Sequence, residues 1–185
     1  GRQVRRAREL GSYELLDVIG KGGMGEVYRA KHRLLARPAA IKLIRPDLLG
    51  TSREAQVTLS RFRREAEVVA TLRSPHTVEL YDFGVADEGS FYFVMELLEG
   101  MDLESLTNRF GPLPAERAVA IAIQACTSLA EAHQRGMIHR DIKPANIIFD
   151  DDGTVHLVDF GSVRNALGAD GLDGKTIVGT YGYMP

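Results

Sequence analysis

The stretch His139-Arg140-Asp141-Ile142-Lys143-Pro144-Ala145-Asn146 decides how the rest of the chain is interpreted. It lies between a long apolar segment and the strand-like run Ile147-Ile148-Phe149, so we expect a polar loop between two buried elements. Such loops are where a scaffold usually carries its chemistry. Pro144 argues against a continuous helix, because it has no N–H donor and restricts the residue before it. Taken alone, the acid, base and amide of this loop are about as typical of an ordinary surface loop as of a functional one.

Composition is typical of a soluble globular protein. The chain has 185 residues, 44% of them hydrophobic and 26% charged, enough for one large domain or two small lobes. A net charge of -2 gives no general attraction to nucleic acid or to an anionic membrane, so neither is predicted as a partner. No apolar stretch is long enough to span a bilayer, and we expect a cytoplasmic chain.

Two smaller features of the sequence carry predictions of their own. Cys126 is the only cysteine, which excludes an intramolecular disulfide. It lies in an apolar helical run, so we predict a core residue rather than a reactive thiol. The segment from Arg2 to Arg8 is basic with no apolar region behind it, which favours a solvated leader over a secretory signal. A membrane-proximal or docking segment is the alternative.

A glycine-rich turn joins two predicted strands near the N-terminus. Residues 13–19 and 26–30 are strand-like, and Gly20, Gly22 and Gly25 between them form G-x-G-x-x-G. Glycine allows backbone N–H groups to approach a phosphate. A dinucleotide-binding fold would need a helix opening at the third glycine, whereas β-forming residues follow here, so a hairpin over phosphates is the better prediction. A plain glycine hairpin is the alternative.

A cation and an acid are predicted to meet in the first half of the chain. Lys42 lies in Ala39–Ile44, which is typical of a buried strand, and a buried ammonium must be paired or directed at a ligand. A helix is predicted near Thr58 to Leu72. Its apolar face comprises Phe62, Ala66, Val69 and Leu72. Glu65 falls on that face and Glu67 points away, so Glu65 is the predicted partner of Lys42, unless it only borders the apolar stripe.

The second half of the chain changes from strands to helices. Strands are predicted at 78–85, 91–95, 147–149 and 155–158, and helices at 102–109 and from Pro114 through Gln134, the latter apolar nearly all round and hence a core helix. Asp159-Phe160-Gly161 follows the last strand. Asn146 and Asp159 carry hard oxygen atoms suited to Mg²⁺. The aperiodic segment 162–175 is typical of a functional or disordered loop.

The motifs and their order resemble a eukaryotic-type protein kinase. They are Gly20–Val27, Lys42, Glu65, His139–Asn146, Asp159–Gly161 and Gly179-Thr180. The amino-acid sequences of the glycine turn and of residues 142–146 are most similar to those of bacterial serine/threonine kinases. The resemblance implies an α+β, two-lobed fold. It implies a leader at 1–12, an N-lobe at 13–95 with five antiparallel strands and one helix, a hinge at 96–100, and a partial, mainly helical C-lobe at 101–185 that ends in the activation segment.

The resemblance also assigns roles to individual residues. It implies that ATP is bound by Ile19, Gly20, Lys21, Gly22, Gly23, Met24, Gly25, Val27, Ala40, Lys42, Met95, Glu96 and Leu98, with Asp102 a weaker candidate for the ribose. The catalytic residues would be Asp141 as base, Lys143 beside the transferring phosphoryl group, and Lys42 positioned by Glu65. Asn146 and Asp159 would bind Mg²⁺.

Substrate class and regulation follow from the same resemblance. Lys143 and Thr180 are typical of kinases that phosphorylate serine and threonine in proteins, and Thr176 is the predicted autophosphorylation site. The chain stops at Pro185, before the later helices of the family, so the long helix at 114–134 is expected to need partners. A truncated, non-catalytic nucleotide-binding or scaffold fragment is therefore the alternative, and a small-molecule kinase a weaker one. One sequence leaves dimerisation open.

Overall fold

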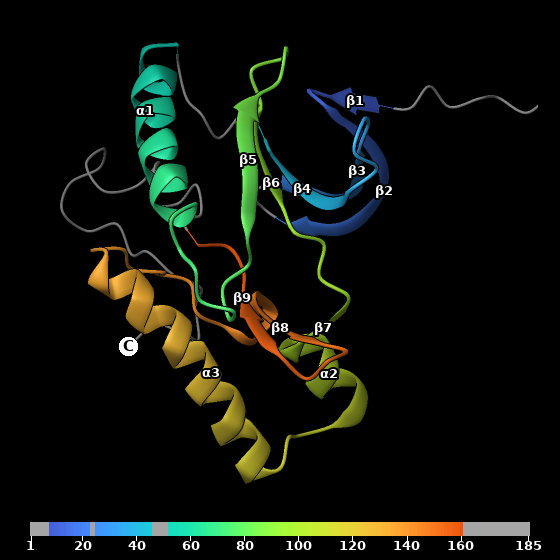
Figure 1. Ribbon diagram of the computed structural model, residues 1–185, viewed down its shortest axis with the longest axis vertical. Helices are drawn as coiled ribbons and strands as arrows, with labels where there is room; N and C mark the ends of the chain where they lie inside the picture. The colour runs from blue at the N-terminus through green and yellow to red at the C-terminus, as the bar shows by residue number, and fades with distance from the viewer. Residues whose placement is uncertain (1–7, 23–24, 46–51, 161–185) are drawn as a thin grey trace, which may run out of the picture. The chain divides into compact units, whose positions relative to one another are not determined.

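The computed structural model describes residues 8–22, 25–45 and 52–160, and the chain divides into two compact units (Figure 1). The first unit comprises residues 1–51 and 80–97, and the second comprises residues 52–79 and 98–185.

The first unit is a curled antiparallel sheet. Its strands are β1 (Arg8–Leu10), β2 (Tyr13–Gly22), β3 (Gly25–His32), β4 (Pro38–Ile44), β5 (Leu80–Val85) and β6 (Phe91–Met95), in the order β1-β2-β3-β4-β6-β5 (Figure 1). Hairpins connect most neighbours, as the alternation of strand-like runs and turn residues predicted.

The sheet has a sixth strand that the sequence analysis did not predict. β1 comes from the end of the segment interpreted as a solvated leader, and it pairs with β2 through Leu10 opposite Tyr13. Leu10 is buried in the core of the unit. Three residues are too few to show an alternating pattern, so only the pairing with β2 reveals this strand.

The core of the first unit lies on one side of the curled sheet. Its buried members are Leu10, Tyr13, Leu15, Ala30, Ala39, Ile41, Ala86 and Val94. β4 is buried along nearly its whole length, as its continuous apolar run predicted. Lys42 is the charged residue within that buried strand.

The second unit begins with α1 (Ser52–Val69). The predicted apolar face is confirmed, because Phe62, Ala66, Val69 and Leu72 are all buried. Glu65 is half-buried and Glu67 is exposed, as their helical spacing predicted. The resemblance predicts this helix in the N-lobe with the strands, whereas its contacts group it with the second unit. The predicted lobe boundaries stay predictions.

Short strands and two further helices complete the second unit. They are β7 (Gly100–Asp102), α2 (Leu103–Phe110), α3 (Ala115–Gln134), the 3-10 turn η2 (Pro144–Asn146), β8 (Ile147–Asp150) and β9 (Val155–Leu157). The three strands form an antiparallel sheet in the order β7-β8-β9. α3 packs against β9, with Ile121, Leu103 and Val155 in a shared core. This packing places the loop that follows α3 beside the end of β9.

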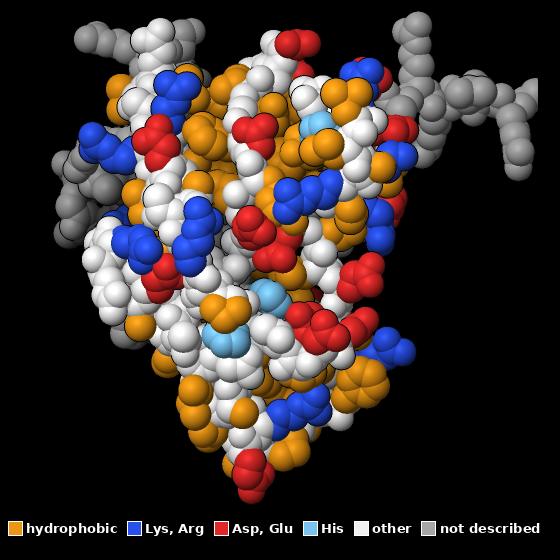
Figure 2. Space-filling model, in the orientation of Figure 1, with side chains coloured by type: hydrophobic (Ala, Val, Ile, Leu, Met, Phe, Trp, Pro, Cys, Tyr) orange, Lys and Arg blue, Asp and Glu red, His pale blue; other side chains and the backbone are white. Residues whose placement is uncertain are grey.

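The prediction that Cys126 is a core residue is wrong. α3 buries Ile121, Ala125, Ser128 and Ala132, one residue for every turn of the helix, and leaves Cys126 exposed. Val119 and Ile123 are exposed on this helix too, 57% and 61% respectively, so α3 is covered on one face rather than all round. In Figure 2 hydrophobic side chains reach the surface along α3. Apolar composition alone does not tell which face of a helix is covered.

Among the helices of the described residues, none is long and apolar enough to cross a membrane.

Candidate functional site

The loop from His139 to Asn146 has the irregular backbone that Pro144 predicted. α3 ends at Gln134, and Gly136 turns the chain with a φ of 72°. Arg140 has a φ of 65°, a left-handed conformation that is uncommon for a residue with a Cβ. Asp159, after β9, shares this feature with a φ of 64°. Backbone strain of this kind clusters at functional sites, where the surrounding structure holds it in place.

Asp141 is the centre of a compact polar cluster. Its carboxylate is buried, and the Asn146 amide nitrogen donates to its Oδ2 (3.1 Å) and to its backbone oxygen (2.8 Å). Lys143 Nζ lies 3.3 Å from the same Oδ2. An ammonium and an amide donor therefore compensate the cost of burying this carboxylate. The structure brings together three residues that the sequence singled out.

His139 connects this cluster to the end of β9, a role that the sequence analysis did not predict. Its Nε2 lies 2.9 Å from the Val158 carbonyl oxygen, which can only accept, so Nε2 carries the proton. Nδ1 then accepts from the backbone N–H of Asp141 (3.3 Å). The ring packs edge-on against Phe160, with centroids 4.6 Å apart. Spacing along the sequence could not reveal the contacts with Val158 and Phe160, because these residues lie about twenty positions after His139.

The charge state of His139 follows from its surroundings. Burial lowers the pKa of the imidazole below its ordinary value of 6.5, although the Val158 carbonyl and the carboxylates of Asp159 and Asp141 act in the opposite direction. The ring is therefore neutral near pH 7, in agreement with the two hydrogen bonds above.

The two predicted magnesium ligands lie on chain segments that are bonded to each other. The backbone N–H of Val158 donates to the backbone oxygen of Asn146 (3.1 Å), and Asp159 follows directly. Both side-chain hydrogen bonds of Asn146 use its amide nitrogen, which leaves its amide oxygen as the atom available to a metal. A carboxylate and an amide oxygen are the hard donors that Mg²⁺ prefers.

The glycine-rich turn is the hairpin that the sequence predicted. Gly20 lies opposite Val27, and Gly22 opposite Gly25. Gly25 has a φ of 153°, and a Cβ there would lie 1.9 Å from the Leu43 carbonyl oxygen, so this position accepts only glycine. Gly23 and Met24 at the turn lie outside the described residues, as do Gly161, Thr176, Gly179 and Thr180.

The other predicted nucleotide-binding residues of the first unit lie on the same sheet. Ile19 and Lys21 are on β2, and the Lys21 ammonium pairs with Glu26 (2.9 Å). Ala40 on β4 lies opposite Met95 on β6, and Lys42 lies between Val27 and Phe93 on the neighbouring strands. Glu96 follows β6 directly. The register thus places Val27, Lys42 and Ala40 on adjacent strands, as a shared site requires.

Three further predicted site residues belong to the second unit. Glu65 is on α1, and Leu98 begins the segment that leads to β7. Asp102 caps α2, because its carboxylate accepts from the backbone N–H (2.8 Å) and the hydroxyl (2.7 Å) of Ser105. This capping gives Asp102 a structural role, and its contact with a ribose stays a prediction.

Residues 13–185 match the sequence model of one protein family, the protein kinase domain. The serine/threonine-protein kinase PknH of Mycobacterium bovis is 40% identical over 174 residues, which are 94% of this chain and 28% of that protein. PknD of Mycobacterium tuberculosis is 40% identical over 176 residues, covering 95% of this chain and 26% of that protein. The chain therefore spans less than a third of the length of these relatives.

A solved structure described as the apo form of PpkA-294 is similar as well. It matches with a TM-score of 0.75 and 26% identity, over 91% of this chain and 65% of that one. The family match covers nearly the whole chain, and it includes the hairpin, the 139–146 loop and Asp159. The chain belongs to the protein kinase domain family and has its two-lobed α+β fold.

Proposed function

We propose that this chain forms the ATP-binding and catalytic part of a serine/threonine protein kinase, which transfers the γ-phosphoryl group of ATP to hydroxyl groups of protein substrates. The observation that carries the proposal is the buried Asp141 carboxylate, held by Lys143 and Asn146 next to the end of β9. The relatives named above as serine/threonine-protein kinases support the substrate class.

In the proposed reaction the substrate hydroxyl oxygen attacks the γ-phosphorus while the bond to the bridging oxygen of ADP breaks. Asp141 orients the hydroxyl and accepts its proton, which later passes to solvent. Lys143, 3.3 Å from Asp141 Oδ2, is near enough to stabilise negative charge on the transferring group as well as on the carboxylate. The proposed chemistry relies on positioning and electrostatics, because the charged groups would already surround the reacting atoms before the reaction begins.

Asn146 and Asp159 would hold Mg²⁺, since their oxygen atoms fit the preference of this ion. When bound, Mg²⁺ would neutralise charge on the phosphate oxygens of ATP. Lys42 would hold the α- and β-phosphates, and Glu65 would position Lys42. The hairpin from Gly20 to Val27 would cover the phosphates with its backbone N–H groups.

Phosphoryl transfer from Mg·ATP to a serine- and threonine-rich protein tests the proposal, with Asp141→Asn as the main variant. The substitution keeps the shape of the side chain and removes the base, so transfer should fall about 10²- to 10⁴-fold. Asp152→Asn is the matched control, because it makes the same chemical change on an exposed residue of the β8–β9 turn. It should retain full activity.

Other outcomes separate the alternatives. A chain whose melting temperature rises with Mg·ATP but which transfers no phosphate would be a non-catalytic nucleotide-binding domain. A chain that neither melts at a higher temperature with Mg·ATP nor transfers phosphate would overturn both functions. For a binder, ligand at about a hundred times its Kd should add roughly 2.7 kcal/mol to the free energy of unfolding.

We also propose Thr176 as the main site of autophosphorylation. It lies just before Gly179-Thr180 in the sequence, outside the described residues. A phosphate there would add charge that an arginine such as Arg140 can bind. Mass spectrometry after incubation with Mg·ATP should find phosphate on Thr176, and phosphate found only at other positions would contradict the assignment.

A further inference from the structure

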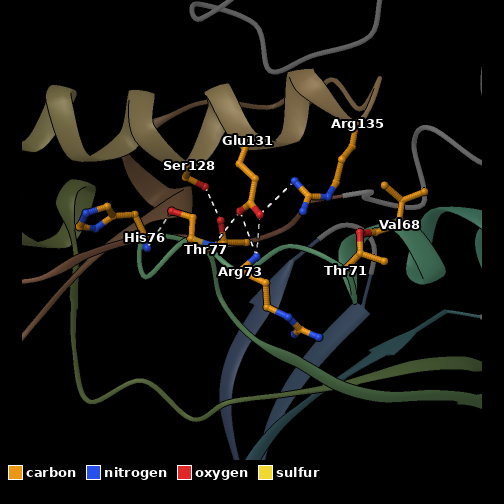
Figure 3. A network of polar contacts seen from close by, with 9 residues as sticks. Val68, Thr71, Arg73, His76, Thr77, Ser128, Glu131 and Arg135 are labelled. Atoms are coloured by element: carbon orange, nitrogen blue, oxygen red, sulfur yellow. Dashed lines mark hydrogen bonds and ion pairs between the residues drawn. The ribbon is translucent and has the colours of Figure 1, made fainter.

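The linker between α1 and β5, residues 70–79, forms hydrogen bonds with α3 at two places (Figure 3). The first is the Glu131 carboxylate, which accepts from the backbone N–H of Arg73 with both oxygens (2.9 and 3.0 Å) and from that of Ser74 with one (2.7 Å). Arg135 Nη1 lies 3.0 Å from the same carboxylate, one helical turn along α3. Glu131 thus accepts from two backbone N–H donors that lie just beyond the helical hydrogen bonds of α1.

The Glu131 carboxylate is charged at neutral pH. Burial acts to raise its pKa, but the two backbone N–H donors and the guanidinium groups of Arg135 and Arg73 outweigh burial, and the pKa lies below its ordinary value. A charged acceptor makes these hydrogen bonds stronger than neutral ones would be.

The second contact with α3 is buried. The hydroxyls of Thr77 and Ser128 form a hydrogen bond, and both residues are almost completely inaccessible to solvent (Figure 3). Thr77 is held from a second side as well, because it forms a β-bridge with Leu157 of β9. The middle of the linker is therefore fixed between a helix and a strand.

Contacts with β9 continue on both sides of that bridge. The backbone N–H of Leu157 donates to the His76 oxygen (2.8 Å), and that of Val78 donates to the Leu157 oxygen (3.0 Å). His76 Nδ1 lies 3.0 Å from the Val155 carbonyl oxygen, so it donates there. β9 continues directly into Val158 and Asp159.

The linker therefore joins three parts of the second unit that the proposed reaction uses. At one end it continues α1, which carries Glu65, through helical hydrogen bonds that extend to Leu72. On one side it contacts β9, which leads to Asp159, and on the other it contacts α3, which leads to the 139–146 loop. Only one residue separates the last helical hydrogen bond of α1 from Ser74, so the Glu131 contact leaves that end of the helix little freedom.

We propose that Glu131 is a positioning residue for the phosphoryl transfer: by binding the Arg73 and Ser74 amides it fixes α1, and with it Glu65, relative to the segment that carries Asp159. The proposal rests on the proposed kinase function. It assigns to Glu131 no contact with ATP or with the protein substrate.

The test is a double-mutant cycle between Glu131→Gln and Glu65→Gln, measured as kcat per folded molecule. Glutamine keeps the size of Glu131 but replaces one acceptor oxygen with a donor that would face the linker amides. We expect kcat to fall about tenfold for Glu131→Gln, the loss of roughly one charged hydrogen bond. The KM for the protein substrate should stay near the wild-type value. Because Glu131 acts through Glu65, adding Glu131→Gln to Glu65→Gln should cause little further loss.

Two controls separate positioning from general stability. Glu116→Gln makes the same change on the exposed first turn of α3 and should leave kcat unchanged. Arg135→Ala removes the ion pair while leaving the amide hydrogen bonds, and it should retain most of the activity. The positioning role is overturned if Glu131→Gln lowers only the melting temperature. It is also overturned if the fold-losses in kcat of Glu131→Gln and Glu65→Gln multiply in the double variant. If the wild-type chain transfers no more phosphate than Asp141→Asn, the proposed function fails, which is a different result.

Discussion

The glycine-rich hairpin and the 139–146 loop serve the same proposed reaction but are built in opposite ways. The hairpin is fixed by the backbone register of β2 with β3 and by a glycine where a Cβ would meet the Leu43 carbonyl. The loop is fixed by side chains, because His139, Lys143 and Asn146 all converge on Asp141 or on the end of β9. Covering phosphates requires backbone N–H groups and little bulk, whereas proton transfer and metal binding require particular side-chain atoms.

The largest effect is expected where the hairpin would have to accept a side chain. Gly25→Ala places a methyl carbon 1.9 Å from a backbone oxygen, and the strands cannot move apart without losing their pairing. We expect a loss of about 3 kcal/mol in the free energy of unfolding, typical of severe overpacking. Chemical denaturation measures it. In Gly22→Ala, the matched control, the added carbon meets nothing within 4 Å, so equal losses for the two variants would contradict this interpretation.

A smaller effect, on activity, is expected where the loop loses a side chain. Asn146→Ala removes the two hydrogen bonds to Asp141 and the predicted metal ligand oxygen. We expect transfer to fall about 10- to 100-fold, because a hydrogen bond to a charged group contributes about 1.5–3 kcal/mol. Steady-state kinetics at several Mg²⁺ concentrations would measure this loss.

The control for that variant is Asn108→Ala, which removes an exposed amide from α2. It should leave the rate unchanged. An Asn146→Ala chain as active as wild type would show that side-chain contacts do not organise this loop, and the contrast with the hairpin would disappear.

The smallest effect is expected from pH, through the buried imidazole of His139 in the loop. The folded-state pKa of His139 lies below its unfolded value of about 6.5, so the unfolded chain takes up the proton first as the pH falls. Stability should therefore decrease as the pH drops from about 6.5 toward the folded pKa, and level off below it. Denaturation curves measured from about one pH unit above the reference pKa to about 1.5 units below it would follow this change.

The variant His139→Gln should lack that part of the pH dependence, and His133→Gln controls for removing an imidazole from an exposed site. Carboxylates with lowered pKa values, those of Glu26, Glu131 and Asp150, lose their contributions only at lower pH, below about 4.5, where they become protonated. A decrease that persists in His139→Gln would assign the effect to another group.

Much of the fold could be predicted because the signals are local. Strand-like runs bounded by turn residues located β2, β3, β4 and β6 within a few residues, and helical spacing identified the buried face of α1. β1 could not be predicted, because a three-residue edge strand exists only through its pairing with β2. The exposure of Cys126 could not be predicted either, since an apolar helix does not show from its sequence which face its neighbours cover.

The sequence by itself determined the chemical groups and their order: the glycine turn, Lys42, Glu65, the 139–146 loop and Asp159, all chosen by residue type and spacing. Only the tertiary structure decided how this loop and the linker at residues 70–79 are held. His139 reaches Val158, Glu131 binds the linker amides more than fifty residues away, and Thr77 meets Ser128. Residue types indicate which chemistry a chain can perform, but hydrogen bonds between distant residues depend on how helices and strands pack, and packing brings together positions that no local pattern connects.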